Sequence, residues 1–397
     1  MSSPAPAVLT GIHDVLAVHS AKGGVGKSTV AVNLAVSAAR LGLKVGLLDA
    51  DIHGPSAATM FGSGERPEIS SDGLHAVPIT RHGVRYLSVA NVAPPGAPVI
   101  WRGPMVSSAL RQLLTEVEWG ELDLLVLDLP PGTGDAILAI SQEVALSGAV
   151  LVTTPQDMSV ADTRRGIGAF RVLRVPILGL VENMSAFACP DCGESADLFG
   201  AGGGERAARE LELPFLGRIP VDPAVTASGD DGVPLAAADP ESPVSVAMDT
   251  ITRTVVAEMA RIRDDAPGEF RVDWTDLGDR QVPDPPDAPD APGAQADPAT
   301  PSRVWQAADD LLGIQWADGE KTFHRAYDLR MACPCAECVE EWTREKLPSL
   351  DRVPRSVRPV VLRSLGRYAL QPSWTDGHST GIHSFADLRR TGSDKPE

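Results

Sequence analysis

Aromatic residues make up only 5% of this 397-residue chain, and its 35 lysines and arginines are outnumbered by 53 aspartates and glutamates. The formal net charge of -18 argues against non-specific binding to nucleic acid or to an anionic membrane, because both need a basic surface. No apolar run approaches the ~18 residues that span a bilayer, and the opening MSSPAPAVLTG lacks the charged region of a signal peptide. We therefore expect a cytoplasmic protein that binds neither nucleic acid nor membranes.

Cysteine is also scarce, and all five cysteines fall into two tight clusters, Cys189/Cys192 and Cys333/Cys335/Cys338. An odd number of thiols grouped in this way suits a disulfide framework poorly and favours metal binding in a reducing compartment. Two thiolates are half of a tetrahedral site, so the first pair must find its remaining ligands elsewhere.

The chain length predicts two or three domains at roughly 150 residues each. In residues 1–263, apolar runs such as DVLAVH, KVGLLDAD and LDLLVLDLP alternate with helical patterns such as STVAVNLAVSAARLG. This alternation is typical of an α/β fold with a doubly wound, mostly parallel sheet. Residues 264–300 are rich in Pro, Asp and Ala and predict a linker. Residues 301–397 then predict a small, mainly β domain.

The stretch HSAKGGVGKSTVAVNLA places a glycine-rich loop between a strand and a helix, as a phosphate-binding P-loop requires. Its backbone N–H groups can surround a phosphate, the Lys27 side chain can reach the β- and γ-phosphates, and Ser28 can ligate Mg²⁺. The general pattern has glycine where this chain has Ala21, and an ordinary glycine-rich turn is the alternative. The residues expected to contact ATP are Gly23, Gly24, Val25, Gly26, Lys27, Ser28 and Thr29.

Carboxylates follow two further apolar runs, at the sheet edge where α/β proteins bind ligands. GLLDADIHGPS contains Asp49 and Asp51, and LDLLVLDLPPGTGD contains Asp128. Asp128 is expected to hold Mg²⁺ through water, as a Walker B carboxylate does, and Asp49 to support Mg²⁺ and the neighbouring loop. Either Asp49 or Asp51 could instead cap the next helix.

The run KGGVGKS resembles the deviant P-loop of a family that includes nitrogenase iron protein, cell-division and chromosome-partition ATPases, and iron–sulfur ATPases. The resemblance implies a homodimer that encloses ATP, in which Lys22 reaches the nucleotide of the facing subunit. It also implies that Asp51 orients the attacking water and that Asn183 contacts the adenine base. The alternatives are a solvated loop lysine for Lys22 and a turn residue for Asn183.

The run VENMSAFACPDCG, together with VIWRGPMVSSALRQLL and TTPQDMSVADTRRGI, resembles the Mrp/Nbp35 (ApbC-type) iron–sulfur cluster carrier ATPases. This resemblance implies that Cys189 and Cys192 of two subunits share one [4Fe–4S] cluster at the dimer interface. The cluster would pass to apo-proteins, in contact with cluster-assembly machinery, while ATP is hydrolysed to ADP and phosphate. A bridging Zn²⁺ or free thiols at the same cysteines remain alternatives.

Two other functions remain open for the whole chain. A ParA/MinD-type partition or positioning ATPase would need a basic face or a C-terminal amphipathic helix, and the ending DLRRTGSDKPE supplies neither. The other is a zinc-stabilised assembly factor that inserts a different metal. Metal content would distinguish this factor from a cluster carrier.

The stretches FHRAYDLRMACPCAECVEEW and YALQPSWTDGHSTGIHSFADLR resemble the DUF971 module, which is also the N-terminal domain of γ-butyrobetaine hydroxylase. That module binds Zn²⁺ through three cysteines in C-x-C-x₂-C spacing and a distant histidine. His383 is a competing ligand and His324 is expected to be structural. No oxygenase core follows, so the module is expected to dock a partner. The residues that match the zinc ligands are Cys333, Cys335, Cys338 and His378.

Overall fold

The chain forms two compact units in a computed structural model, one spanning Leu9–Met259 and the other containing the residues from Ala260 onward. No helix among the described residues combines the length and the apolarity needed to cross a membrane. The structure describes residues 9, 11–51, 54–71, 73, 75–92, 110, 112–114, 116–132, 137, 140, 144, 146–156, 167–171, 173, 175–188, 195–264, 268–275, 298–335, 338–339, 345–365 and 369–393.

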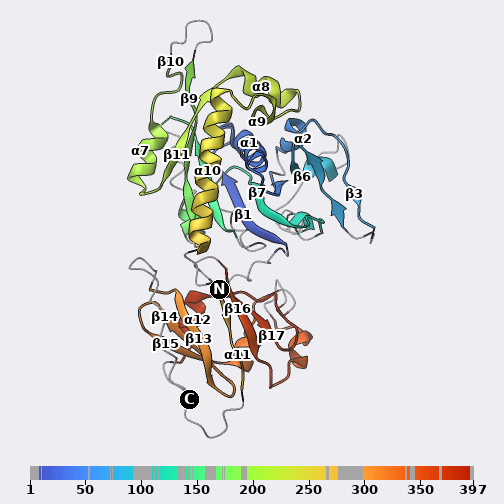
Figure 1. The fold of residues 1–397 in the computed structure, drawn as a ribbon, viewed down its shortest axis with the longest axis vertical. Helices are drawn as coiled ribbons and strands as arrows, with labels where there is room; N and C mark the ends of the chain where they lie inside the picture. The colour runs from blue at the N-terminus through green and yellow to red at the C-terminus, as the bar shows by residue number, and fades with distance from the viewer. Residues whose placement is uncertain are drawn as a thin grey trace. The chain divides into compact units, whose positions relative to one another are not determined.

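The first unit is built on a nine-stranded sheet with the order β10-β9-β8-β1-β7-β2-β6-β5, and β11 also pairs with β9 (Figure 1). All pairings are parallel except those of β5 with β6 and β10 with β9. The strands are β1 Ile12–His19, β2 Val45–Asp49, β5 Ile79–Arg81, β6 Val84–Ser88, β7 Leu122–Asp128, β8 Gly148–Thr153, β9 Ile177–Ala188, β10 Ser195–Ala196 and β11 Phe215–Val221.

Helical segments cover both faces of this sheet because its central strands are apolar on both sides. Helix α1 (Lys27–Arg40) packs against β1, β2 and β7 on one face. Val15 and Ala17, which alternate with Leu16 and Val18 along β1, lie in a core cluster with Leu110 and Phe170 on the other face. The predicted doubly wound, mostly parallel α/β fold is confirmed.

The remaining elements of the first unit are short, apart from α10, whose buried residues Met248, Ile251 and Val255 pack toward the core. Strands β3 and β4 form a separate two-stranded sheet. These elements are β3 Glu68–Ile69, β4 Ala76–Val77, α2 Ala57–Met60, α3 Val89–Val92, α7 Gly203–Glu210, α8 Pro223–Asp230, α9 Leu235–Ala238 and α10 Pro243–Asp264.

The second unit is mainly β, as predicted. It contains a four-stranded sheet, β12-β16-β17-β18, and a three-stranded sheet, β13-β14-β15. Its core cluster includes Trp316, Leu362 and Phe385 together with the three C-terminal cysteines. The elements are β12 Glu269–Arg271, β13 Pro301–Ala308, β14 Leu311–Trp316, β15 Lys321–Arg325, α11 Ala326–Met331, the 3₁₀ helix Pro348–Arg352, β16 Pro359–Leu365, β17 Ala369–Trp374, β18 His383–Ser384 and α12 Phe385–Thr391.

One strand of this unit lies inside the segment 264–300 that composition predicted as a linker. Strand β12 pairs antiparallel with β16, Val272 is buried in the core, and the Trp274 indole Nε1 donates to the Pro359 carbonyl at 2.6 Å. The apolar side chains of Phe270, Val272 and Trp274 are enough to anchor so short a strand. The average composition of the segment does not reveal them. Residues 268–275 are therefore part of the C-terminal unit, while 276–297 lie outside the described residues.

Candidate nucleotide site and metal site

Three central strands of the first unit deliver polar residues to one edge of the sheet. In the parallel registers, Asp128 at the end of β7 lies beside Val18 of β1 and Asp49 of β2. Strand β1 ends at His19, and the glycine-rich loop begins with the next residue, Ser20. Because carboxyl ends of parallel strands meet at one edge, the loop and the carboxylates form a single site.

The glycine-rich loop depends on two left-handed glycines. Gly24 and Gly26 both have φ of 78°, a conformation that costs other residues free energy. A Cβ atom on Gly26 would lie 2.2 Å from the Asn183 Nδ2 atom, whereas one on Gly24 would meet nothing within 4 Å. Helix α1 follows with no acidic residue in its first turn, so its N-terminal partial positive charge is not offset there. The loop thus has an open side suited to a phosphate.

Lys27 lies within a buried cluster of acceptors. Its Nζ atom is 2.5 Å from Asp128 Oδ1, 3.7 Å from Asp51 Oδ2 and 3.2 Å from the Ser28 Oγ atom. Asp51 also accepts the Gly54 backbone N–H at 3.2 Å, which holds the loop after β2. The structure therefore brings Lys27 together with the carboxylates of Asp51 and Asp128.

Asp128 has unused capacity as a ligand. It is fully buried, and its Oδ2 atom has no hydrogen-bond partner among the described residues. Burial raises the pKa of Asp128 even though Lys27 lies beside it. A buried carboxylate oxygen without a partner, near a serine hydroxyl, suits a hard cation such as Mg²⁺. Ser28 and Asp128 are thus the residues that could hold this ion.

Asp49 is occupied by protein donors. One of its oxygens accepts the backbone N–H groups of Ser56 and Ala57 at 2.9 and 3.0 Å and the Ser88 hydroxyl at 3.0 Å. The other accepts the Asp51 N–H at 3.2 Å. Burial and the nearby Asp128 raise the pKa of Asp49 to about 6. Asp49 therefore organises the loop that carries Asp51, and it accepts N–H groups at the start of α2, which is the helix-capping alternative given above for Asp49.

Asn183 on β9 holds the glycine-rich loop directly. Its side-chain amide donates to the Val25 carbonyl at 2.9 Å, and it is only 7% exposed. The next residue, Met184, has a left-handed φ of 57°. This amide N–H is engaged by the loop, and the adenine contact expected for Asn183 stays a prediction.

Two buried residues at this edge were not singled out from the sequence. His19, at the end of β1, is 1% exposed, lies edge-on to Phe170 at 5.6 Å, and has no partner for either ring nitrogen among the described residues. Burial, and then the charge of Lys27, lowers its pKa to about 4, so the ring is neutral. A histidine that closes an apolar strand just before a glycine-rich loop is the signal that could have identified it.

Glu182 is the second. It is fully buried, its Oε2 accepts the Gly204 backbone N–H at 2.6 Å in the first turn of α7, and its Oε1 is 3.3 Å from the Arg218 Nε atom. A carboxylate inside the apolar run ILGLVEN was the available signal. Glu182 anchors α7 to the strand that also carries Asn183.

The first cysteine pair, Cys189 and Cys192, lies outside the described residues. The residues on either side are described: β9 ends at Ala188, and β10 returns antiparallel with Ala196 opposite Phe187. Figure 1 shows β9 and β10 running beside each other beyond the other strands of the sheet. The cysteine pair therefore belongs to the connection between two paired strands.

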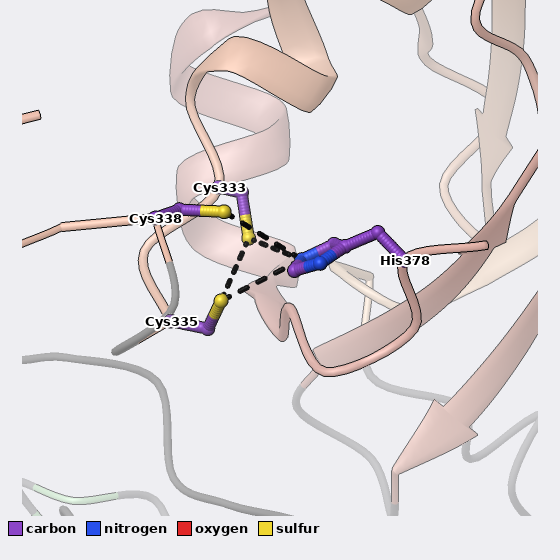
Figure 2. A group of neighbouring side chains, drawn as sticks. All are labelled: Cys333, Cys335, Cys338 and His378. Atoms are coloured by element: carbon purple, nitrogen blue, oxygen red, sulfur yellow. Dashed lines mark hydrogen bonds between the residues drawn. The ribbon is translucent and has the colours of Figure 1, made fainter. Parts of the chain in front are cut away.

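The second cysteine cluster forms a compact ligand group in the C-terminal unit (Figure 2). The His378 Nε2 atom is 3.2, 3.5 and 3.8 Å from the Sγ atoms of Cys333, Cys335 and Cys338. All four ligand atoms lie within 4.8 Å of one another, and each cysteine is at most 5% exposed. Three thiolates and an imidazole complete a tetrahedron, so this group could hold one metal ion.

The two other C-terminal histidines are not members of this group. The His324 Nε2 atom is 3.2 Å from the Thr322 hydroxyl, and burial lowers its pKa to about 4. Burial, and then His324, lowers the pKa of His383 to about 4 as well. Among the described residues, His378 lies with the three cysteines in one group of possible metal ligands, and His383 is not part of that group.

Comparison with known proteins gives two family matches that follow the two units. Residues 304–389 match the gamma-butyrobetaine hydroxylase-like N-terminal family. Residues 11–256 match the ParA family, described as NUBPL iron-transfer P-loop NTPases. The resemblances to iron–sulfur P-loop ATPases and to the N-terminal module of γ-butyrobetaine hydroxylase are thereby confirmed.

Individual relatives and one solved structure agree with the second match. The chain is 46% identical over 265 residues to an iron–sulfur protein required for NADH dehydrogenase from Arabidopsis thaliana, covering 66% of this chain and 84% of that protein. It is 48% identical over 252 residues to an iron–sulfur cluster carrier protein from Deinococcus radiodurans, covering 64% and 71%. An ADP-bound nucleotide-binding protein from Archaeoglobus fulgidus aligns with a TM-score of 0.50 and 39% identity, covering 56% and 88%.

The matched family covers more than half of the chain and includes the glycine-rich loop, Lys27 and both carboxylate positions around it. The chain therefore belongs to the ParA family of NUBPL-type iron-transfer P-loop NTPases.

Proposed function

We propose that this protein is an ATP-dependent carrier of iron–sulfur clusters in a reducing compartment such as the cytosol. It binds a [4Fe–4S] cluster at a homodimer interface, in contact with the cluster-assembly machinery, passes the cluster to apo-proteins, and hydrolyses ATP to ADP and phosphate. One observation carries the proposal: the strand β9 touches the glycine-rich loop through Asn183 and ends one residue before Cys189.

This strand gives a direct route from nucleotide to cluster. Asn183 and Cys189 are six residues apart, a span of at most roughly 20 Å. Pairing with β8 as far as Glu182 and with β11 as far as Phe187 fixes β9, so the strand moves as a unit with the Val25 carbonyl that Asn183 binds. A change in the loop when ATP binds or is cleaved shifts the cysteine pair, and with it the grip on the cluster.

The chain's own residues supply the ATPase chemistry by position and charge. The loop N–H groups and Lys27 bind the phosphates, and Thr29 contacts the α-phosphate. Ser28 and Asp128 would hold Mg²⁺, which neutralises phosphate charge when bound. Asp51 orients the attacking water, and Lys22 reaches the nucleotide of the second subunit.

A dimer of this kind accounts for the incomplete first cysteine cluster. Two copies of Cys189 and Cys192 provide four thiolates across one two-fold axis, which is the ligand number of a [4Fe–4S] cluster. The cluster is cargo and must be exchangeable. The C-terminal set of Cys333, Cys335, Cys338 and His378 is instead buried within one chain, and we assign it a structural Zn²⁺. This unit then serves as a docking module for a partner.

The relatives favour cargo transfer over positioning. Proteins 46% and 48% identical to this chain are named as an iron–sulfur protein and an iron–sulfur cluster carrier. A ParA/MinD-type positioning role would leave the cysteine pair without a purpose.

The deciding experiment measures iron, acid-labile sulfide and zinc per chain after anaerobic purification. The unsubstituted chain is compared with a Cys189→Ser/Cys192→Ser variant. We expect about two iron and two sulfide per chain, lost in the variant, with about one zinc retained in both. Zinc at both sites after anaerobic reconstitution with iron and sulfide would overturn the carrier function.

Coupling is tested by transfer to an apo-acceptor. Lys27→Ala should bind the reconstituted cluster but lose the ATP dependence of its release. Identical transfer rates for this variant and the unsubstituted chain, with and without ATP, would contradict the coupling through β9.

A further inference from the structure

We propose that Arg330 is a positioning residue for the C-terminal metal, because it joins the cysteine half of the ligand set to the loop that carries His378. The proposal rests on the metal binding assigned above to Cys333, Cys335, Cys338 and His378. It adds a residue that the ligand spacing does not reveal.

The guanidinium of Arg330 makes two contacts on opposite sides of the site. Its Nη1 atom donates to the Cys338 Sγ atom at 3.2 Å, and its Nε atom donates to Asp376 Oδ2 at 2.9 Å. The other oxygen of Asp376 accepts the His378 backbone N–H at 3.1 Å. A single side chain therefore connects one sulfur ligand to the backbone of the nitrogen ligand.

Charge explains why an arginine occupies this position. Three thiolates around a divalent cation leave one net negative charge, in a group whose cysteines are at most 5% exposed. Arg330 is itself 5% exposed, and its planar fork offers parallel donors that keep their charge at any ordinary pH. Burying this cation stabilises the chain only if its acceptors stay in place. The thiolate and Asp376 are those acceptors.

The local sequence places Arg330 in the last turn of α11, three residues before Cys333. The Cys333 backbone N–H donates to the Arg330 carbonyl at 3.2 Å, so the helix end also fixes the first ligand. A hydroxyl supplements this arrangement, since Thr380 donates to the Cys335 Sγ atom at 3.3 Å. Ligands held from outside in this way are oriented before the metal binds.

The test is an Arg330→Met substitution in the full-length chain, with zinc and cobalt(II) as probes. Metal affinity is measured by competition with a chromophoric chelator, and cobalt(II) is also followed through its sulfur-to-metal charge-transfer absorption. We expect affinity to fall by about 10- to 100-fold, as for other partners of metal ligands. The cobalt absorption should shift, because the Cys338 sulfur loses its hydrogen-bond donor and the energy of its charge-transfer band changes.

Arg325→Met is the matched control. Arg325 lies five residues earlier, its side chain is 49% exposed, and its guanidinium pairs with Asp310 at 2.7 Å. This variant should keep the affinity and the spectrum of the unsubstituted chain.

Two further variants keep the test decisive if Arg330→Met folds poorly. Asp376→Asn retains an acceptor for the His378 N–H but removes the ion pair with Arg330, and should cost a smaller fraction of the affinity. The double variant Arg330→Met/Asp376→Asn removes both charges of the Arg330–Asp376 ion pair, so neither partner is left unpaired. It should therefore fold yet bind metal as weakly as Arg330→Met.

The outcomes separate this inference from the metal assignment. A metal affinity within twofold of that of the unsubstituted chain, together with an unchanged cobalt spectrum, would overturn the role of Arg330. This applies to Arg330→Met and to the double variant. A chain that binds neither zinc nor cobalt at the four ligands, with Arg330 intact, would instead overturn the metal assignment itself.

Discussion

The two units differ in whether the polar atoms of their sites already have hydrogen-bond or ligand partners. In the nucleotide unit, Asp128 keeps an oxygen without a partner among the described residues, and Gly24 leaves one side of the loop open. In the C-terminal unit, each thiolate of the ligand group has a donor or ligand neighbour within 3.8 Å, and the group is enclosed. Unused bonding capacity marks a site that exchanges ligands, whereas a saturated and buried set marks a site that holds one ion permanently.

The strongest test of this contrast is Cys338→Ser. Losing one of four ligands should release the metal and unfold the C-terminal unit, since structural zinc contributes on the order of 10 kcal/mol to small domains. ATP hydrolysis by the other unit should remain within a few-fold. Metal analysis and near-ultraviolet circular dichroism measure the first effect, and phosphate release measures the second. Stoichiometric zinc retained by the variant would show that the site is not a closed tetrahedron.

Lys27→Met tests the open site. Removing the cation that faces the phosphates and Asp128 should lower kcat for ATP hydrolysis by about 10²- to 10³-fold. Zinc content should not change. Lys44→Met is the control, because Lys44 is an exposed lysine outside the site. Hydrolysis by Lys27→Met at the rate of the control would remove Lys27 from the mechanism.

Acid should affect the two units differently. His324 and His383 have pKa values lowered from 6.5 to about 4, so the unfolded chain binds more protons than the folded chain between these values. Stability is therefore full above pH 6.5 and falls toward pH 4, by roughly 3 kcal/mol for each histidine. In the first unit, the lowered pKa of His19 likewise reduces stability as the pH falls. Asp49, with its pKa raised to about 6, opposes it, since its protonation stabilises the fold between about pH 6 and 4.

Urea unfolding at a series of pH values checks this difference. Five of the seven tryptophans follow Met259, so fluorescence reports mainly on the C-terminal unit. In the zinc-loaded chain, His324→Gln should shift the acid midpoint of that unit to lower pH, because one group that must be protonated has been removed. Both proteins contain the same thiolates, so protonation of the thiolates shifts both acid midpoints equally and does not affect their difference. An unchanged midpoint would mean that His324 does not limit acid stability.

Asn183→Ala is expected to have the smallest effect. It removes one buried hydrogen bond to the Val25 carbonyl and should cost about 1–3 kcal/mol of stability, with weaker ATP binding. Asn91→Ala is a matched control, because Asn91 is a buried amide that donates to the Glu65 carbonyl at 2.9 Å, away from the loop. Equal ATP affinity in the two variants would show that Asn183 does not organise the loop.

Several features could be predicted because they are encoded in contiguous residues. Apolar runs flanked by helical patterns specified the parallel sheet, and the segment from Lys22 to Thr29 specified the glycine-rich loop, since strand, loop and helix follow one another without interruption. The spacing of Cys333, Cys335 and Cys338 likewise favoured one metal site. Composition, in contrast, concealed β12, because three apolar residues among many prolines and aspartates do not alter an average.

Only the tertiary structure decided how distant residues use their hydrogen bonds. The sequence alone determined which polar groups are present, but not where their side chains point. From the sequence, Asp49, Asn183 and Arg330 could each have faced solvent, a ligand or the backbone. Strand register placed Asp49 against Ser88, β9 brought Asn183 to Val25, and the packing of α11 directed Arg330 to Cys338 and Asp376. Such contacts join residues up to 158 positions apart, and their energies depend on burial that exists only in the folded chain.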